Sequence, residues 1–248
     1  MCQICFSRRR FLSLGAMAAA MPLAACDERP DLISDEMIEQ MGLESWKQIA
    51  STVPRSGRSD LQEALDQVAV RLLRKANETP SDWEFVVFAS PEANAFALPG
   101  GKIGVYEGMF KVTENADQLA AIVGHEIGHV QADHGKERVE AEVVAGTGMR
   151  IVTALLDAAD IQYAEEIAAA LGLGAEVGLL LPYSRKQELE ADRLGLTAMA
   201  RAGFNPREAV ELWRNMQRRG GRAPEVLSTH PAPRSRIREI EAMLPELT

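Results

Sequence analysis

Apolar residues recur every three or four positions through much of this chain, which is the spacing of a helix that buries one face. The clearest example is the stretch 60–77, in which Leu61, Leu65, Val68 and Leu72 form a single stripe. The same periodicity, with its start and stop signals, predicts further helices over residues 35–50, 116–130, 184–203, 207–219 and 234–244.

Between residues 83 and 106 the pattern changes to short runs of β-branched and aromatic residues, which are typical of strands. Residues 83–88 predict one strand. Residues 95–98 and 102–106 flank Pro99-Gly100-Gly101, so they predict a hairpin in which glycine supplies the positive φ of the turn. We therefore expect a mostly helical α+β domain with a small antiparallel sheet beside the helix 116–130.

The segment between residues 137 and 182 carries two apolar runs, 151–156 and 171–181. Both runs are too short to span a bilayer, which takes about 20 consecutive apolar residues. We expect them to form core helices. The alternative is a surface that dips into lipid or grips unfolded protein.

The chain begins with the pattern of an export signal, which has arginines at 8–10 and a short apolar run over 14–23. Leu23-Ala24-Ala25-Cys26 then resembles a lipoprotein cleavage box, whose cysteine receives the lipid. We expect residues 1–25 to be removed, 26–34 to be a lipidated tether and 35–248 to be the folded domain. A plain secretory signal is the alternative, and the export route and the choice of inner or outer membrane stay open.

Loss of the export signal would leave Cys26 as the only cysteine, so the mature chain would form no internal disulfide. It would also remove three arginines and no acid, which changes the formal net charge from −9 to −12. A chain this acidic is not expected to bind nucleic acid, whose phosphates attract basic surfaces. The remainder is long enough for one domain with a sizeable core.

Candidate chemistry is concentrated in His125-Glu126-Ile127-Gly128-His129, inside the predicted helix 116–130. Residues four apart lie on one face of a helix, so both imidazoles can reach a single metal ion. Glu126 lies about 100° around the helix from His125, where it can act on a water molecule instead of binding the metal. This pattern is typical of zinc hydrolases. The alternative is a core helix with two hydrogen-bonded histidines.

A catalytic zinc ion needs a third protein ligand and an open fourth position. Glu188 and Asp192 are four residues apart and share a face of the predicted helix 184–203. We assign Glu188 as the third ligand and Asp192 as the hydrogen-bond acceptor that orients a histidine ligand. His134 follows His129 by five residues and is turned about 140° from the ligand face, so we interpret it as a helix-end or supporting histidine.

His125–His129 followed by Ser184-Arg185-x-x-Glu188-x-x-Ala191-Asp192 resembles the HtpX and CAAX-prenyl-protease family of zinc metallopeptidases, which is metallopeptidase family forty-eight. Residues 94–101 and Ser228-Thr229-His230-Pro231 fit the same family, so the resemblance covers roughly residues 83–244. The chain looks more like the soluble periplasmic branch typified by BepA than like the integral-membrane members. In this family the glutamate four residues before the aspartate is the third zinc ligand, which corresponds to Glu188.

The resemblance implies a zinc endopeptidase on the periplasmic side of the bacterial cell envelope, anchored to the membrane through Cys26, that cleaves misfolded or misassembled envelope proteins. One zinc ion per chain would lower the pKa of its bound water to about 7, with Glu126 as general base. Substrate would add as a strand to the hairpin, unless the hairpin is purely structural. A lipid-tethered holdase or assembly factor with a structural or latent zinc site is the alternative. The hairpin residues expected to line the substrate cleft are Asn94, Ala95, Phe96 and Ala97.

His230 stands in a loop that is stiffened by Pro231 and Pro233, because the residue before each proline is kept out of helical geometry. We expect His230 to face the zinc cleft. There it can stabilise the oxyanion, help to seat substrate, or bind zinc as a fourth ligand that holds the enzyme inactive. The alternative is a hydrogen-bonded loop histidine that orders the last helix.

Overall fold

The computed structural model describes residues 33–141, 144, 146, 183–218, 230 and 234–247. The expected export signal, Cys26 and the apolar runs 151–156 and 171–181 lie outside the described residues. Within the described residues, no helix combines the length and the apolar character that a membrane span requires.

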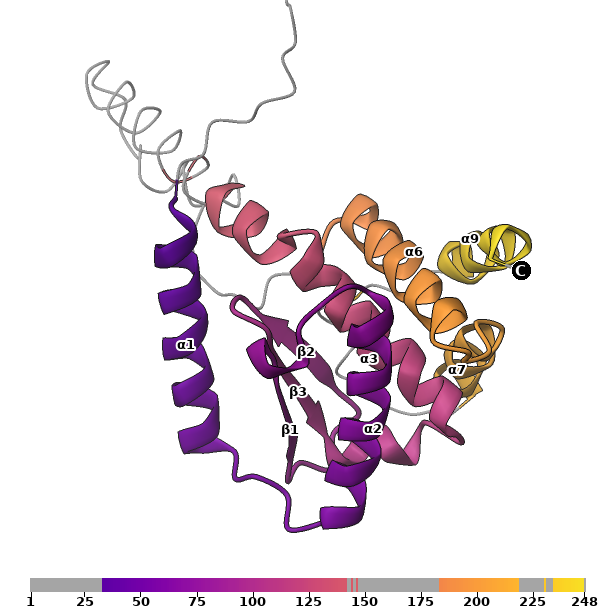
Figure 1. Ribbon diagram of the computed structural model, residues 1–248, viewed down its shortest axis with the longest axis horizontal. Helices are drawn as coiled ribbons and strands as arrows, with labels where there is room; N and C mark the ends of the chain where they lie inside the picture. The colour runs from indigo at the N-terminus through magenta and orange to yellow at the C-terminus, as the bar shows by residue number, and fades with distance from the viewer. Residues whose placement is uncertain are drawn as a thin grey trace, which may run out of the picture. The chain divides into compact units, whose positions relative to one another are not determined.

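A three-stranded sheet in the order β1-β3-β2 lies between layers of helices (Figure 1). β2 (Ala95–Leu98) and β3 (Lys102–Tyr106) form the expected antiparallel hairpin, and Gly100 and Gly101 in its turn have φ of 79° and 69°. β1 (Glu84–Phe88) pairs with β3 in the parallel direction. The expected α+β domain with a small sheet is confirmed, and its hairpin is antiparallel as predicted, but the parallel pairing of β1 makes the sheet mixed. Because β3 lies between β1 and β2, β2 is an edge strand.

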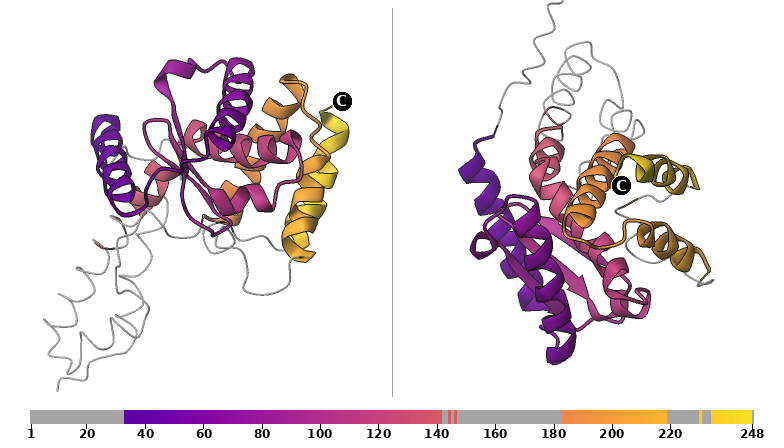
Figure 2. Two further views of the ribbon diagram at one scale, coloured as in Figure 1. Left: turned by 90° about the horizontal axis from the view of Figure 1, so that it is seen from below. Right: turned by 45° about the vertical axis from the view of Figure 1, so that its right-hand side comes forward.

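One face of the sheet is covered by α2 (Ser59–Lys75) and α3 (Ala116–Gln131), as Figures 1 and 2 show. Successive side chains of a strand point to opposite faces, so every second strand residue enters this core. The apolar stripe that the sequence predicts on α2 is buried here, in particular at Leu65, Val68 and Leu72. The strand residues of the core are Val87, Ala95, Ala97, Ile103 and Val105.

The opposite face of the sheet is covered by α1 (Asp35–Thr52) through a small aromatic core. Trp46 of α1 meets Phe88 edge-on, with 5.4 Å between the ring centroids. Phe96 stacks beside Phe88 at 6.1 Å. A Cβ on Gly104 would lie 2.3 Å from the Phe96 ring, so the aromatic core requires glycine at this position of β3.

The remaining long helices lie on the side of α3 away from the sheet (Figures 1 and 2). They are α6 (Arg185–Arg201), α7 (Glu208–Arg218) and α9 (Arg234–Met243). The described part of the chain also contains short 3-10 helices that the periodicity does not predict, namely η2 (Pro80–Asp82), η3 (Glu107–Lys111) and η4 (Leu244–Glu246).

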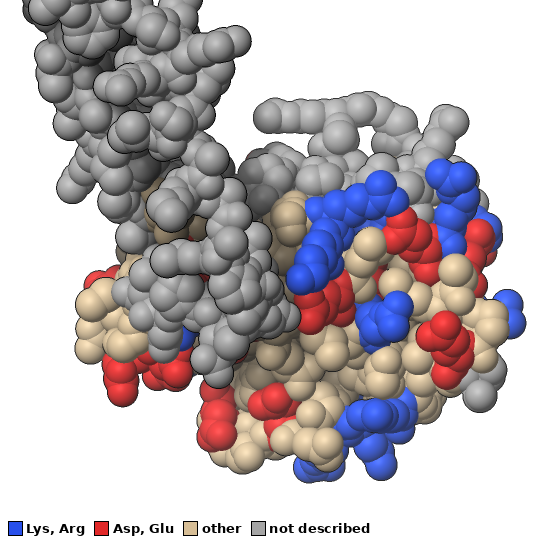
Figure 3. Space-filling model, turned by 90° about the horizontal axis from the view of Figure 1, so that it is seen from above, with Lys and Arg blue, Asp and Glu red and all other residues tan. Residues whose placement is uncertain are grey.

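Ion pairs at the surface connect α9 to its neighbours. Arg185 of α6 pairs with Glu239, and Arg214 of α7 lies 2.8 Å from Glu241. Such exposed pairs contribute little individually, typically about 0–1 kcal/mol. Basic and acidic side chains are interspersed over the face of the molecule that Figure 3 shows.

Local sequence sets where α3 and α6 begin. The side chain of Asn115 accepts a hydrogen bond of 2.9 Å from the backbone N–H of Gln118 and so caps α3. Ser184 and Gln187 form a capping box at the start of α6, in which each side chain accepts from the backbone N–H of the other residue. Both helices that carry the candidate chemistry therefore have a defined first turn.

α3 and α6 approach so closely that their backbones touch. A Cβ on Gly195 would lie 2.7 Å from the carbonyl carbon of Gly124, and a Cβ on Gly128 would lie 2.7 Å from the carbonyl oxygen of Ala191. Each helix thus presents two small residues four positions apart, on one face. No larger side chain fits at these positions unless the helices separate.

Gly195→Ala is expected to lower the free energy of unfolding by about 1–3 kcal/mol, because the added methyl group forces two backbones apart. Denaturant unfolding measures this difference. Gly57→Ala is the matched control, since its Cβ would meet nothing within 4 Å. It should be neutral or stabilise the domain by up to about 1 kcal/mol. Equal stability of the two variants would contradict the backbone contact between α3 and α6.

Candidate metal centre

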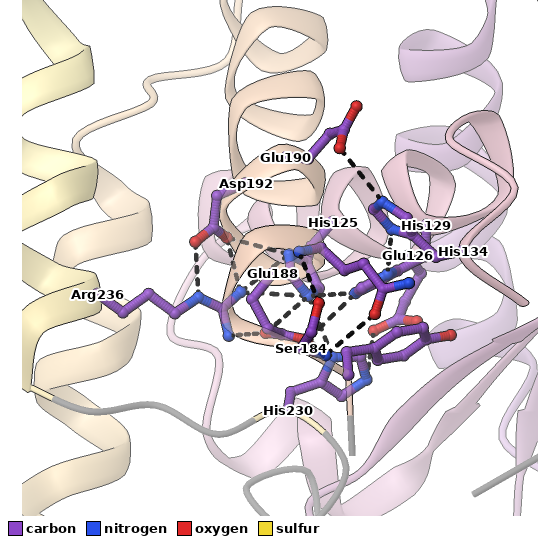
Figure 4. Close-up of polar contacts among 12 residues, drawn as sticks. His125, Glu126, His129, His134, Ser184, Glu188, Glu190, Asp192, His230 and Arg236 are labelled. Atoms are coloured by element: carbon purple, nitrogen blue, oxygen red, sulfur yellow. Dashed lines mark hydrogen bonds and ion pairs between the residues drawn. The ribbon is translucent and has the colours of Figure 1, made fainter. Parts of the chain in front are cut away.

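Four buried side chains converge where α3 and α6 face each other (Figure 4). His125 and His129 come from α3, Glu188 comes from the first turn of α6, and His230 comes from the chain between α7 and α9. Each offers one ligand atom, and these atoms all lie within 4.8 Å of one another. The structure thus brings together the three ligands predicted from the sequence, with His230 beside them.

The candidate ligand atoms are close enough together to share one zinc ion. Around zinc, with bonds of about 2.0–2.2 Å, tetrahedral ligand atoms are about 3.3–3.6 Å apart. Glu188 Oε2 lies 3.5 Å from His125 Nε2, Glu188 Oε1 lies 3.4 Å from His129 Nε2, and the two Nε2 atoms are 3.0 Å apart. His230 Nδ1 lies 3.2 Å from His125 Nε2 and 2.9 Å from Glu188 Oε1, which places it beside these ligand atoms.

The buried charges also fit a divalent cation. Glu126, Glu188 and Asp192 are buried acids, and Arg236 is the buried base among them. Three acids against one guanidinium make this buried network acidic in a region with little solvent. Buried charges are stable only when they are paired or coordinate a metal, so the residues present fit Zn²⁺ in charge as well as in spacing.

Asp192 accepts a hydrogen bond of 3.0 Å from Nδ1 of His125, which is the orienting geometry expected from the sequence. Burial opposes ionisation of Asp192, but attraction to Arg236 and its hydrogen bonds lower the pKa of the carboxyl to about 2. The carboxylate therefore stays ionised and favours the tautomer of His125 that carries its proton on Nδ1. The lone pair of Nε2 is then directed at the other ligands.

The other two ligands also have the protonation states that metal binding needs. Burial, followed by repulsion from His125, keeps the pKa of His129 well below its usual value, so its imidazole is neutral. Burial opposes ionisation of Glu188, but its interactions with the surrounding histidines, His125 first, and with Arg236 hold the pKa of the carboxyl well below the usual range. Glu188 is therefore a carboxylate, which is the form that can bind a metal.

Arg236 is a member of the site that the spacing of the motifs does not identify. Its Nε and Nη2 each lie 2.6 Å from one oxygen of Asp192, in a bidentate pair, and its Nη1 pairs with Glu188. The guanidinium lies over the ring of Trp213, 4.4 Å from the centroid. Arg236 thereby connects α9 and α7 to the ligand helix α6.

Glu126 is buried beside this cage without belonging to it. Its Oε1 lies 3.5 Å from His230 Nε2, and its Oε2 has no hydrogen-bond partner among the described residues. His125, Glu126, His230 and Arg236 border a cavity of about 20 Å³. Such a cavity has room for about one water molecule. The carboxylate is therefore next to a space in which a single small molecule can react.

The sequence predicts that the substrate cleft is lined by Asn94, Ala95, Phe96 and Ala97. Asn94 precedes the edge strand β2, and the other three lie in it. Ala95 packs into the main core and Phe96 into the aromatic core, so of the four only Ala97 borders the large cavity. Ala97 and His129 line one cavity of about 480 Å³, which extends from the metal centre to α1. Cys26, the predicted lipidation site, lies outside the described residues.

Several known proteins are similar to this chain in sequence. The chain is 38% identical over 185 residues to the mitochondrial metalloendopeptidase OMA1 of Schizosaccharomyces pombe, an alignment that covers 73% of this chain and 52% of OMA1. It is 28% identical over 240 residues to the beta-barrel assembly-enhancing protease of Escherichia coli strain K12, with 91% and 49% covered. For OMA1 of Saccharomyces cerevisiae the identity is 32% over 201 residues, with 73% and 55% covered. The chain spans about half the length of these curated relatives.

The model of peptidase family M48 matches residues 59–244, which is most of the chain. The match extends from α2 through α9 and includes all of the clustered histidines and acids described above. The fold, the buried donor set and this match agree, and the chain belongs to peptidase family M48.

Proposed function

We propose that this chain is a zinc-dependent endopeptidase in which His125, His129 and Glu188 hold the metal and Glu126 is the general base. The proposal rests above all on one observation, the buried donors close enough together to share one zinc ion, next to a buried carboxylate outside the cage. Membership of a peptidase family and the names of two relatives, a metalloendopeptidase and a protease, support the same activity.

Zinc, when bound, supplies a Lewis acid that lowers the pKa of water and polarises a carbonyl oxygen. Glu126 takes a proton from water at Oε2, the atom without a partner in the described structure, and returns it to the leaving amine. Asp192 keeps the proton of His125 on Nδ1. Arg236 in turn holds Asp192 in place through its bidentate pair.

The edge strand is the proposed binding site for the substrate backbone. The N–H of Tyr106 donates to the carbonyl of Asn94 at 3.0 Å, which makes these residues a hydrogen-bonded pair of the hairpin. Such pairs alternate along an antiparallel ladder, so Ala95 and Ala97 direct their own N–H and C=O groups to the open edge. An extended peptide can add there as a further strand, beside the cavity that Ala97 shares with His129.

His230 is proposed to be a fourth ligand that closes the site. Its Nδ1 is within 3.2 Å of both His125 Nε2 and Glu188 Oε1, where it can take the fourth position that a catalytic zinc site keeps open. Substrate could reach the metal only when His230 moves away. The site would then be latent until the segment that carries His230 is displaced.

We further propose that the protein acts on the periplasmic side of the cell envelope, tethered to the membrane by a lipid on Cys26, and cleaves misfolded or misassembled proteins. The lipoprotein-like box and the name of the beta-barrel assembly-enhancing protease support this setting. A tethered holdase or assembly factor is the second candidate. With His230 the cage would have four protein ligands, which is the composition of structural zinc sites.

Glu126→Gln is expected to reduce cleavage of casein by roughly 10²–10⁴-fold while the fold and the zinc content are retained, because an amide cannot take the proton. Cleavage rate, zinc content and melting temperature are measured on one preparation. Glu63→Gln, an exposed position on α2, is the matched control and should leave all three unchanged. Undiminished turnover by zinc-loaded Glu126→Gln protein would favour the holdase.

His230→Ala is expected to increase the casein cleavage rate at saturating zinc and to weaken zinc retention, because the fourth position is opened. Rates and competition with a chelator measure the two effects. A lower rate with unchanged zinc affinity would assign His230 to stabilisation of the oxyanion instead. If rate, affinity and melting temperature all stay at wild-type values, His230 only orders the loop before α9.

Cys26→Ser is expected to prevent lipidation and the cleavage that accompanies it, so that the protein is no longer recovered as a lipoprotein. Mass spectrometry of the mature wild-type N-terminus should find an acylated Cys26 as the first residue. An unmodified Cys26, or a mature chain that starts elsewhere, would disprove the proposed anchor.

A further inference from the structure

His134 contacts the nitrogen of His129 that faces away from the other ligands. The Nδ1 atoms of the two rings are 2.9 Å apart, which is a hydrogen-bond distance, and both side chains are buried (Figure 4). His129 therefore has a polar partner on the side opposite its ligand atom Nε2, as His125 has in Asp192.

A break in the helix brings His134 to this position. α3 ends at Gln131, and Asp133 adopts a left-handed conformation with φ of 52°. An uninterrupted helix would turn His134 about 140° away from the ligand face. The turn at Ala132 and Asp133 instead changes the direction of the backbone. His134 begins the next helical segment, and from there its side chain packs against His129.

We propose that His134 is a positioning residue that selects the tautomer and the ring orientation of the zinc ligand His129. The proposal rests on the proposed zinc binding. Nε2 of His129 must offer a lone pair to the metal, so its proton is on Nδ1. That proton can be shared with His134 only if Nδ1 of His134 is the acceptor, which places the proton of His134 on Nε2. The contact with His134 thus favours the tautomer of His129 whose Nε2 lone pair is free to bind the metal.

The neighbouring aromatic ring cannot make this selection. Tyr183 stacks on His129 with 3.7 Å between the centroids and 21° between the planes. Stacking restrains the tilt of the imidazole, but a ring turned by 180° about its Cβ–Cγ bond would stack equally well. Only one of the two orientations directs Nδ1 at His134 and Nε2 at the ligand cage. The hydrogen bond therefore decides whether Nε2 or the carbon Cε1 of His129 faces the ligand cage.

Glu190 lies behind His134, on the side away from His129, and contributes less to the orientation of the two rings. Its Oε2 lies 3.6 Å from Nε2 of His134, which is longer than a hydrogen bond, and its side chain is 51% exposed. Solvent screens an interaction of this kind. The effect on the metal should therefore depend mainly on the acceptor that His134 presents to His129, and little on the carboxylate behind it.

Two substitutions of His134 separate positioning from packing. Asn places an amide oxygen near the position of Nδ1 and keeps the acceptor, whereas Leu fills the space without one. In the full chain, competition with a chelator should show that His134→Leu weakens zinc affinity roughly 10–100-fold. His134→Asn should retain most of the affinity. Glu190→Gln, the matched control, should change it by less than about fivefold.

Nitrogen-15 NMR of the imidazoles gives a readout that packing alone would not move. Zinc-loaded wild-type protein should show His129 protonated on Nδ1 and His134 protonated on Nε2. Wild-type zinc affinity in His134→Leu, an equal loss in the Asn and Leu variants, or a proton on Nδ1 of His134 would each overturn the proposal. A wild-type chain that retains no zinc would overturn the metal site as well. A wild-type chain that binds zinc but cleaves no casein would disprove the proposed peptidase activity, and the role of His134 in zinc binding would still stand.

Discussion

Small residues let the backbones of α3 and α6 touch, and the metal centre depends on that contact. His125 and His129 each directly follow a glycine of the contact, Gly124 or Gly128. On α3 the two histidines are therefore turned about 100° around the helix axis from the two glycines that touch α6. Metal–ligand distances vary by only about 0.2 Å, whereas a single added methyl group would separate the helices by more. Direct contact between the two backbones thus brings Glu188 close enough to reach both histidines.

The same closeness buries charge, and the rest of the fold has to compensate for it. Three acids are removed from water at the junction of α3 and α6. Arg236 from α9 compensates one of them through its pairs with Asp192 and Glu188, and a divalent metal fits the remainder. Removing one partner from such a buried network is costly, about 3–5 kcal/mol in other proteins. The C-terminal helix is therefore part of this buried network.

Periodicity and spacing in the sequence determined much of this arrangement. Apolar repeats of 3.6 residues predicted the described long helices, and Pro99-Gly100-Gly101 predicted the hairpin. The four-residue spacings of His125 and His129, and of Glu188 and Asp192, predicted two facing sets of polar side chains. These inferences succeed because they concern a single element, in which the regular rise and turn of the backbone convert sequence distance into direction.

The tertiary structure alone decided the contacts between elements. Alternation along β1 specifies which residues face each layer, but not that the strand pairs with β3 in parallel. Arg236 shares a helix stripe with the apolar Ile240 and Leu244, which is a local signal, yet its partners are remote in sequence. His134 reaches His129 only because Asp133 leaves the helical conformation. Each of these features depends on a strand pairing, a buried charge or a chain reversal. Their free energy comes from partners that folding brings together, which local periodicity does not encode.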